Sequence, residues 1–131
     1  MQPFVPKVGE VIDRYGPSDG RYTSPVVEGE PYSYDKRVLP YVEDQSQYHQ
    51  YEVIGDMSRL DDYIANCKDP TLKAQIERDI SYYYNDDYSN IKACRGEIAG
   101  VEGFGSGGGV HYEFPIKIEY LGKLGILKEI K

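Results

Sequence analysis

Two histidines are the side chains of this sequence best suited to acid–base chemistry. His49 and His111 each stand next to a tyrosine in a short segment of alternating polar and apolar residues. Two histidines that face one cleft can act as a general acid and a general base. The commoner role of a lone strand histidine is a structural hydrogen bond, and the spacing leaves both roles open.

Cations in the first 55 residues provide a second chemical capability. They lie in or beside turns: Arg14, Arg21, Lys36 and Arg37. Guanidinium groups bind phosphate in a bidentate manner, so two converging arginines would hold a pyrophosphate. The usual alternative is a solvated surface ion pair with a neighbouring acid such as Asp13, Asp19 or Asp35.

A glycine-rich loop at residues 103–109 is the third feature. Glycines let a phosphate or a ring approach backbone amides closely. The loop is not a dinucleotide-binding fingerprint, because a strand rather than a helix follows it, and it lacks the lysine of a P-loop. Composition alone favours a hairpin or linker loop.

The elements that must position these groups fall into three stretches. Residues 1–55 are rich in turns, with short strands expected near 8–15 and 48–54. Residues 56–95 carry helix signals, including Asp56 as a capping residue and the pair Asp69-Pro70 at a helix start. Residues 110–118 alternate like a strand, and 120–130 suggest a short turn or helix followed by a closing strand. The pattern predicts a helical hairpin between two β-rich parts.

Composition limits the class of protein. With 131 residues, 40% of them hydrophobic, the chain is expected to form one folded domain. The net charge of −7 without a basic stripe argues against a nucleic-acid partner. The absence of a long apolar run argues against a membrane span, and the first residues do not read as a signal peptide, so an export signal is expected elsewhere on a longer parent chain. Cys67 and Cys94 do not stand in a metal-binding motif, and they are compatible either with a disulfide or with two reduced thiols.

Taken in order, these pieces resemble the TNT family, the NAD glycohydrolase domains related to the tuberculosis necrotizing toxin. The matching segments are GEVIDRYG at 9–16, GRYTSP at 20–25, RVLP at 37–40, YHQYEV at 48–53, GSGGGVHY at 105–112 and LGKL at 121–124. The resemblance covers nearly the whole chain except 56–95. It implies an α+β fold with a mostly antiparallel, twisted β-sheet core and a helical insert at 56–95.

The resemblance also implies a function and a set of site residues. The function is cleavage of the nicotinamide–ribose bond of NAD(P)+, which is a substrate here, with no separate cofactor and no metal. By position, the NAD-binding residues are Arg14, Tyr22, Arg37, His49 and the loop glycines Gly107, Gly108 and Gly109, and the catalytic ones are His111, Arg37 and His49.

His111 departs from the family pattern, which has a catalytic glutamine at this place. The pyridinium leaves as neutral nicotinamide, so the protein must mainly hold the diphosphate and position a nucleophile for an oxocarbenium-like ribosyl group. At this place His111 can orient water for hydrolysis, redirect the reaction to cyclisation or group transfer, or mark reduced activity. Retained NAD cleavage is the expectation.

Two other functions remain open at this stage. One is a metal-independent ribonuclease toxin in which His49 and His111 act as acid and base. The other is an NAD-binding module without turnover. The toxin function further implies a cognate immunity protein, for which the tyrosine-rich segment 56–95 is a candidate surface. The favoured alternative for this segment is a structural hairpin that covers the sheet. It also implies secretion as the C-terminal part of a larger toxin that acts in the cytoplasm of a target cell.

Overall fold

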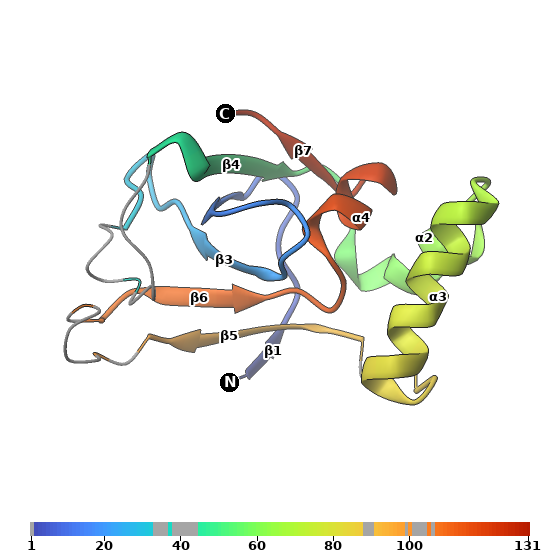
Figure 1. Ribbon diagram of the computed structural model, residues 1–131. Coiled ribbons are helices and arrows are strands. Elements are labelled where there is room, and N and C mark those ends of the chain that lie inside the picture. The colour runs from blue at the N-terminus through green and yellow to red at the C-terminus, as the bar shows by residue number, and fades with distance from the viewer. Residues whose placement is uncertain are drawn as a thin grey trace.

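A twisted antiparallel sheet forms the centre of the protein, as Figure 1 shows. The computed structural model describes residues 2–32, 37, 45–87, 91–98, 100, 105 and 107–131. Its strands are β1 (Gln2–Phe4), β2 (Val11–Tyr15), β3 (Tyr22–Pro25), β4 (Tyr48–Val53), β5 (Ala93–Glu97), β6 (Val110–Glu113) and β7 (Leu127–Glu129). They pair in the order β1-β5-β6-β3-β2-β4-β7, and each neighbouring pair is antiparallel. The predicted α+β fold with a mostly antiparallel sheet is confirmed.

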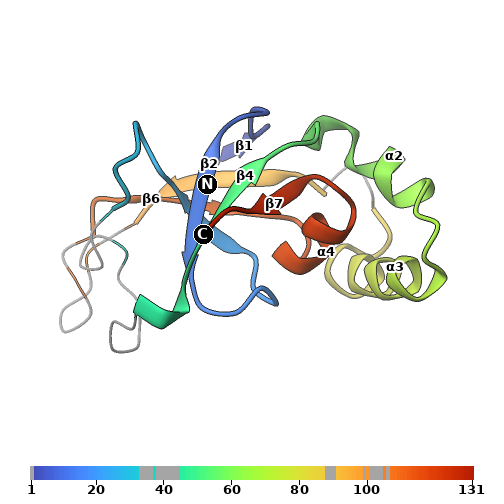
Figure 2. The same cartoon turned by 90° about the horizontal axis from the view of Figure 1, so that it is seen from above.

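Helices gather at one end of the sheet (Figures 1 and 2). They are the short 3-10 turn η2 (Met57–Arg59), α2 (Leu60–Ala65), α3 (Pro70–Tyr84) and α4 (Ile118–Lys123). Another 3-10 turn, η1 (Gln45–Gln47), lies at the opposite end, directly before β4. In both views α4 lies between the sheet and α3. Among the described helices, none is both long and apolar enough to cross a bilayer.

The predicted capping signals act as expected. The Asp56 carboxylate accepts a hydrogen bond from the Ser58 amide at the start of η2, and Asp69 accepts from the first free amides of α3. Asn85, with a left-handed φ of 49°, ends α3. The last helix of the segment therefore ends at Tyr84, earlier than the predicted limit of residue 95. Residues from Ala93 onward already belong to strand β5.

Proline shortens the last predicted strand. Alternation predicts a strand over 110–118, but β6 ends at Glu113 and α4 begins at Ile118. Pro115 has no amide hydrogen and restricts the backbone of the residue before it, so the ladder cannot continue. The apolar residues that follow enter the core instead, where Phe114, Ile116 and Leu121 are almost fully buried.

Candidate functional site

The sheet register divides the predicted site residues between two faces. Asp13 pairs with Ser24 and with Gln50, and Arg14 pairs with His49. Because successive side chains along a strand point to opposite faces, Asp13 lies on one face and Arg14 with His49 on the other. Tyr22 shares the face of Ser24 and therefore that of Asp13, and it pairs with Glu113. His111, two residues before Glu113, lies on this same face, which we call the Asp13 face.

A buried ion pair marks the Asp13 face. Arg37 Nη2 lies 2.6 Å from Asp13 Oδ2, and the Tyr48 hydroxyl donates to the same oxygen at 2.7 Å. The Asp13 side chain is 0% exposed and that of Arg37 only 4%. The guanidinium also stacks on Tyr15, 5.0 Å from the ring centre, and Arg37 Nε donates to the Tyr32 carbonyl. These contacts therefore fix the buried Arg37 side chain in one orientation.

Tyr48 and Asp13 depend on each other electrostatically. Burial, together with the hydrogen bond to Asp13, raises the pKa of Tyr48 to about 12, although the Gln50 amide that donates to its hydroxyl at 2.8 Å opposes the shift. The second oxygen, Asp13 Oδ1, is buried and has no hydrogen-bond partner in the part of the chain that the structure describes. A buried carboxylate that is only partly satisfied needs its cationic partner strongly.

Tyr22 and His111 form the accessible part of the Asp13 face. Their rings meet edge to face with centres 5.8 Å apart, and Tyr22 is 48% exposed. The Tyr22 hydroxyl donates to Glu113 Oε2 at 3.1 Å, and Arg21 Nη1 lies 3.4 Å from Glu113 Oε1. Tyr22 and Arg21 also line a hollow of about 240 Å³ together with Tyr83 and Lys117. The cluster offers an aromatic surface beside a carboxylate.

His111 is adjusted toward its neutral form. Burial lowers its pKa from the ordinary value of 6.5, and nearby Glu113 partly opposes this shift. A neutral imidazole can accept a proton or a hydrogen bond on one nitrogen and donate on the other. His111 can therefore orient a water molecule or a hydroxyl group near pH 7.

Arg14 braces the turn that carries Tyr22. Its Nε donates to the Pro17 carbonyl and its Nη1 to the Tyr22 carbonyl, both at 2.8 Å. A Cβ atom added at Gly20 would lie 2.0 Å from Arg14 Nη2, so this position needs glycine for the guanidinium to pass. Guanidinium has five N–H donors, and these contacts do not use them all.

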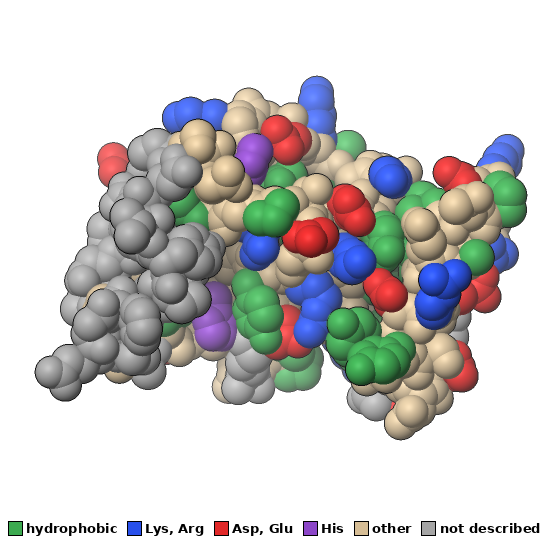
Figure 3. All heavy atoms as spheres, in the orientation of Figure 1, with side chains coloured by type: hydrophobic (Ala, Val, Ile, Leu, Met, Phe, Trp, Pro, Cys, Tyr) green, Lys and Arg blue, Asp and Glu red, His purple; other side chains and the backbone are tan. Residues whose placement is uncertain are grey.

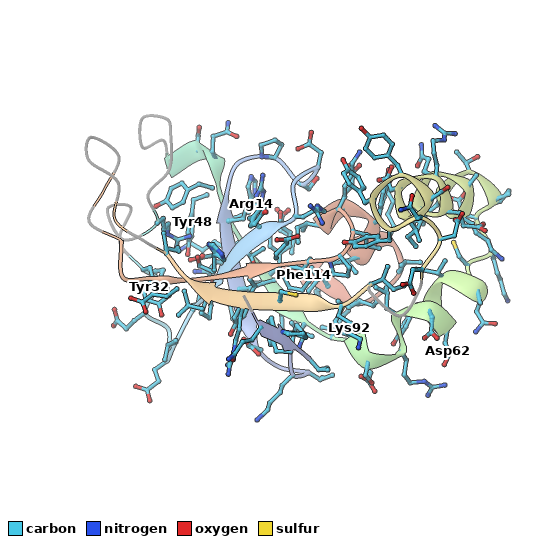
Figure 4. All side chains as sticks on the ribbon, turned by 90° about the horizontal axis from the view of Figure 1, so that it is seen from below. Arg14, Tyr32, Tyr48, Asp62, Lys92 and Phe114 are labelled. Atoms are coloured by element: carbon cyan, nitrogen blue, oxygen red, sulfur yellow. The ribbon has the colours of Figure 1, made fainter. Side chains whose placement is uncertain are left out.

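His49 lies across from Arg14 on the same face. His49 Nδ1 is 3.5 Å from Glu129 Oε2 of the neighbouring strand, and its side chain is partly exposed. Both histidines reach the surface on the side of the molecule seen in Figure 3. Figure 4 shows Arg14, Tyr32 and Tyr48 away from α2 and α3, whereas Asp62 lies at the helical end.

The strand order separates the two histidines. Strands β3 and β2 lie between β6, which carries His111, and β4, which carries His49. Three strand spacings of about 4.8 Å give up to about 14 Å along the sheet. Although both histidines reach the surface on one side of the molecule, two strands separate them and the register places them on opposite faces of the twisted sheet. This separation argues against an acid–base pair acting on one phosphate.

The described part of the glycine loop closes the hairpin between β5 and β6. The Gly108 amide donates to the Ile98 carbonyl, and the Ile98 amide donates to the Gly109 carbonyl. Gly107 and Gly108 adopt positive φ angles of 74° and 93°, which glycine tolerates best. Residues 101–104 and 106 lie outside the described residues. The Gly108 amide is thus used within the protein.

Other candidate sites carry less chemistry. The described residues hold no group of three or more His, Cys, Asp or Glu side chains placed for a metal ion. Cys67 and Cys94 are free, partly buried thiols and are not joined. A larger hollow of about 770 Å³ at the helical end, lined by residues such as Arg59, Cys67 and Lys123, contains none of the predicted site residues.

Sequence reasoning missed two residues of this region. Asp13 appeared only as a surface partner for a nearby cation, although the aromatic Tyr15, two residues further along the strand and thus on the same face, was a signal of burial. Glu113 was not singled out. Its spacing of two from His111 in an alternating segment was a signal that both share one face.

Comparisons with known proteins agree with the resemblance in the sequence. The family model of the tuberculosis necrotizing toxin, TNT, matches residues 7–70. A solved structure of that toxin complexed with its immunity factor IFT is similar to this chain with a TM-score of 0.55 and 20% sequence identity. The alignment covers 92% of this chain and 48% of that one, so this chain spans about half the length of the solved protein. No curated protein matches the chain. The chain is thus similar to the TNT family over residues 7–70, and its fold is similar to that of the solved toxin.

Proposed function

We propose that this domain is a toxin domain that binds NAD(P)+ and cleaves its nicotinamide–ribose bond, releasing nicotinamide and ADP-ribose. The observation that carries the proposal is that Arg14, Tyr22, Arg37 and His49 all fall within the segment matched by the TNT family model. The fold supports it further, since Tyr22 lies against His111, the residue at the place of the family's glutamine.

The nicotinamide end of the substrate is proposed to lie on the Asp13 face beside Tyr22 and His111. An exposed tyrosine and an edge-on imidazole suit contact with a flat aromatic ring. The rest of the molecule would extend past the end of β2, where Arg14 and His49 lie, and Arg14 has donors for a diphosphate. Arg37 would act mainly by fixing this face, because its side chain is only 4% exposed.

Cleavage places little demand on proton transfer to the leaving group. The bond between nicotinamide nitrogen and ribose carbon breaks with its electron pair on the nitrogen, so a positive charge develops on the ribose. Holding the substrate in place and supplying negative charge near the ribose are the main tasks of the protein. Neutral His111 would orient the attacking water, and hydrolysis is the proposed outcome, with cyclisation as the alternative fate of the same cation.

The partner and the place of action are also proposals. Since the solved TNT structure contains an immunity factor, we propose that a cognate immunity protein binds this domain. We further propose that the domain is secreted as the C-terminal part of a larger toxin and acts in the cytoplasm of a target cell.

The test is direct. Purified protein is incubated with NAD+ and separately with NADP+, and nicotinamide, ADP-ribose and cyclic ADP-ribose are separated and identified by mass spectrometry. The expected result is nicotinamide with the linear product. Calorimetric binding of NAD+ without nicotinamide release would instead favour the binding module, and cleavage of RNA in EDTA would favour the ribonuclease.

A further inference from the structure

Glu113 is the acidic group of the Tyr22–His111 cluster. It stands directly across from Tyr22 in the antiparallel pair of β3 and β6, and its Oε2 accepts the Tyr22 hydroxyl at 3.1 Å. Its side chain is 28% exposed, so it reaches the surface rather than the core. It therefore places a carboxylate at the edge of the aromatic surface proposed for nicotinamide.

The proposed reaction needs negative charge at this place. Loss of nicotinamide leaves a ribosyl group with oxocarbenium character, and carboxylates stabilise such transition states in glycoside cleavage. Neither a neutral imidazole nor a tyrosine hydroxyl carries a full negative charge. The His111–Tyr22 pair thus lacks the group that the chemistry requires, and Glu113 can supply it.

The other carboxylates near the sheet are less suitable. Asp13 is fully buried and paired with Arg37. Glu10 accepts the hydroxyl of buried Tyr112 at 2.7 Å, and Glu129 lies beside His49 on the opposite face. Among the residues that the structure describes, Glu113 is the carboxylate that contacts Tyr22 and shares the face of His111.

We infer that Glu113 is a catalytic residue of NAD cleavage, its carboxylate contacting the ribosyl group beside Tyr22; the inference rests on the proposed function. As the nitrogen–carbon bond breaks, the electron pair leaves with neutral nicotinamide and Glu113 stabilises the cationic ribosyl carbon. Water oriented by His111 then forms the new carbon–oxygen bond. Glu113 accepts the water proton and releases it to solvent, so NAD+ and water give nicotinamide, ADP-ribose and one proton.

The surrounding contacts hold the Glu113 side chain in a fixed orientation. Arg21 Nη1 lies 3.4 Å from Oε1 while Tyr22 holds Oε2, so each oxygen has its own partner. Arg21 itself is anchored by the Tyr84 hydroxyl at 3.2 Å and the Phe114 carbonyl at 3.3 Å. This anchoring links the helix α3 to the carboxylate.

The test compares Glu113→Gln with the wild-type domain and with Glu97→Gln, which changes an exposed carboxylate on the neighbouring strand β5. Nicotinamide release gives kcat and KM, calorimetry gives the dissociation constant for NAD+, and thermal unfolding reports the fold. We expect Glu113→Gln to lower kcat by about 100-fold or more. Its dissociation constant should stay within about threefold of the wild type, and Glu97→Gln should leave both quantities unchanged.

Chemical rescue separates a catalytic role from a structural one. In Glu113→Ala, added formate can occupy the space of the lost carboxylate and should restore part of kcat without changing the melting temperature. Wild-type kcat in folded Glu113→Gln would overturn the inference, as would a loss confined to NAD+ binding or a failure of formate to restore any activity in folded Glu113→Ala. If the wild-type domain releases no nicotinamide, the proposed function itself fails, which is a different result.

Discussion

Replacing Asp13 by asparagine should damage the protein far more than its small chemical change suggests. The substitution keeps the size of the side chain but removes the charge that faces Arg37 at 2.6 Å. Arg37 would remain buried with a positive charge and no opposite charge from Asp13. Removing one member of a buried ion pair is strongly destabilising, because the desolvated partner is left uncompensated.

The size of the effect follows from burial. A buried pair broken on one side costs roughly 3–5 kcal/mol. At about 2.1 cal/mol/K per residue, unfolding of 131 residues carries an entropy near 0.28 kcal/mol/K, so the melting temperature should fall by about 11–18 °C.

Asp62→Asn is the matched control. It removes the same charge from an ion pair with Arg59 at 3.2 Å, but these side chains are 56% and 67% exposed. Exposed pairs contribute about 0–1 kcal/mol, which corresponds to less than about 4 °C. Thermal and urea unfolding measure both variants. Equal melting temperatures for Asp13→Asn and Asp62→Asn would refute the structural role given to the buried pair.

Three further predictions concern the candidate site. Gly20→Ala should displace the Arg14 guanidinium, because the added Cβ falls 2.0 Å from Nη2; NAD+ should bind several-fold more weakly by calorimetry, and unchanged affinity would argue against Arg14 as a ligand. The wild type should lose folding stability between pH 10 and about 12, because the pKa of Tyr48 is raised to about 12 in the folded protein and its stabilising effect is lost as the pH rises through this range. Tyr48→Phe should not show this loss. Urea midpoints that fall equally in both proteins across this range would contradict the prediction. Because the pKa of His111 is lowered, its imidazole should stay neutral down to below pH 6.5, and kcat/KM should fall on acidification with a midpoint below 6.5. The variant His111→Gln should not show this fall. A fall of kcat/KM at the same pH in the variant would assign the titration to another group.

Local signals predicted much of the fold. Asp56, Asp69 and Pro70 marked helix starts correctly because capping acts within one turn and needs no distant partner. Strand β5 was missed because Ala93–Glu97 contains glycine and charged residues and lacks regular alternation. It forms through pairing with β6, the next strand along the chain, and with β1 at the other end of the sequence.

The site was predicted less completely than the fold, for a physical reason. Residue types indicated which side chains can bind a phosphate or move a proton, but the face that each side chain occupies depends on strand register. Arg14 and His49 lie on one face while Tyr22 and His111 share the other, a division that the sequence order does not express. The burial of Arg37 against Asp13 likewise depends on residues that are 24 positions apart.

NAD+ cleavage by the wild-type domain remains the most direct measurement. With micromolar protein and excess NAD+, nicotinamide release is followed by mass spectrometry, while thermal unfolding verifies that the protein is folded. The proposed function predicts nicotinamide and ADP-ribose in equal amounts. Folded protein that releases no nicotinamide over several hours would contradict it.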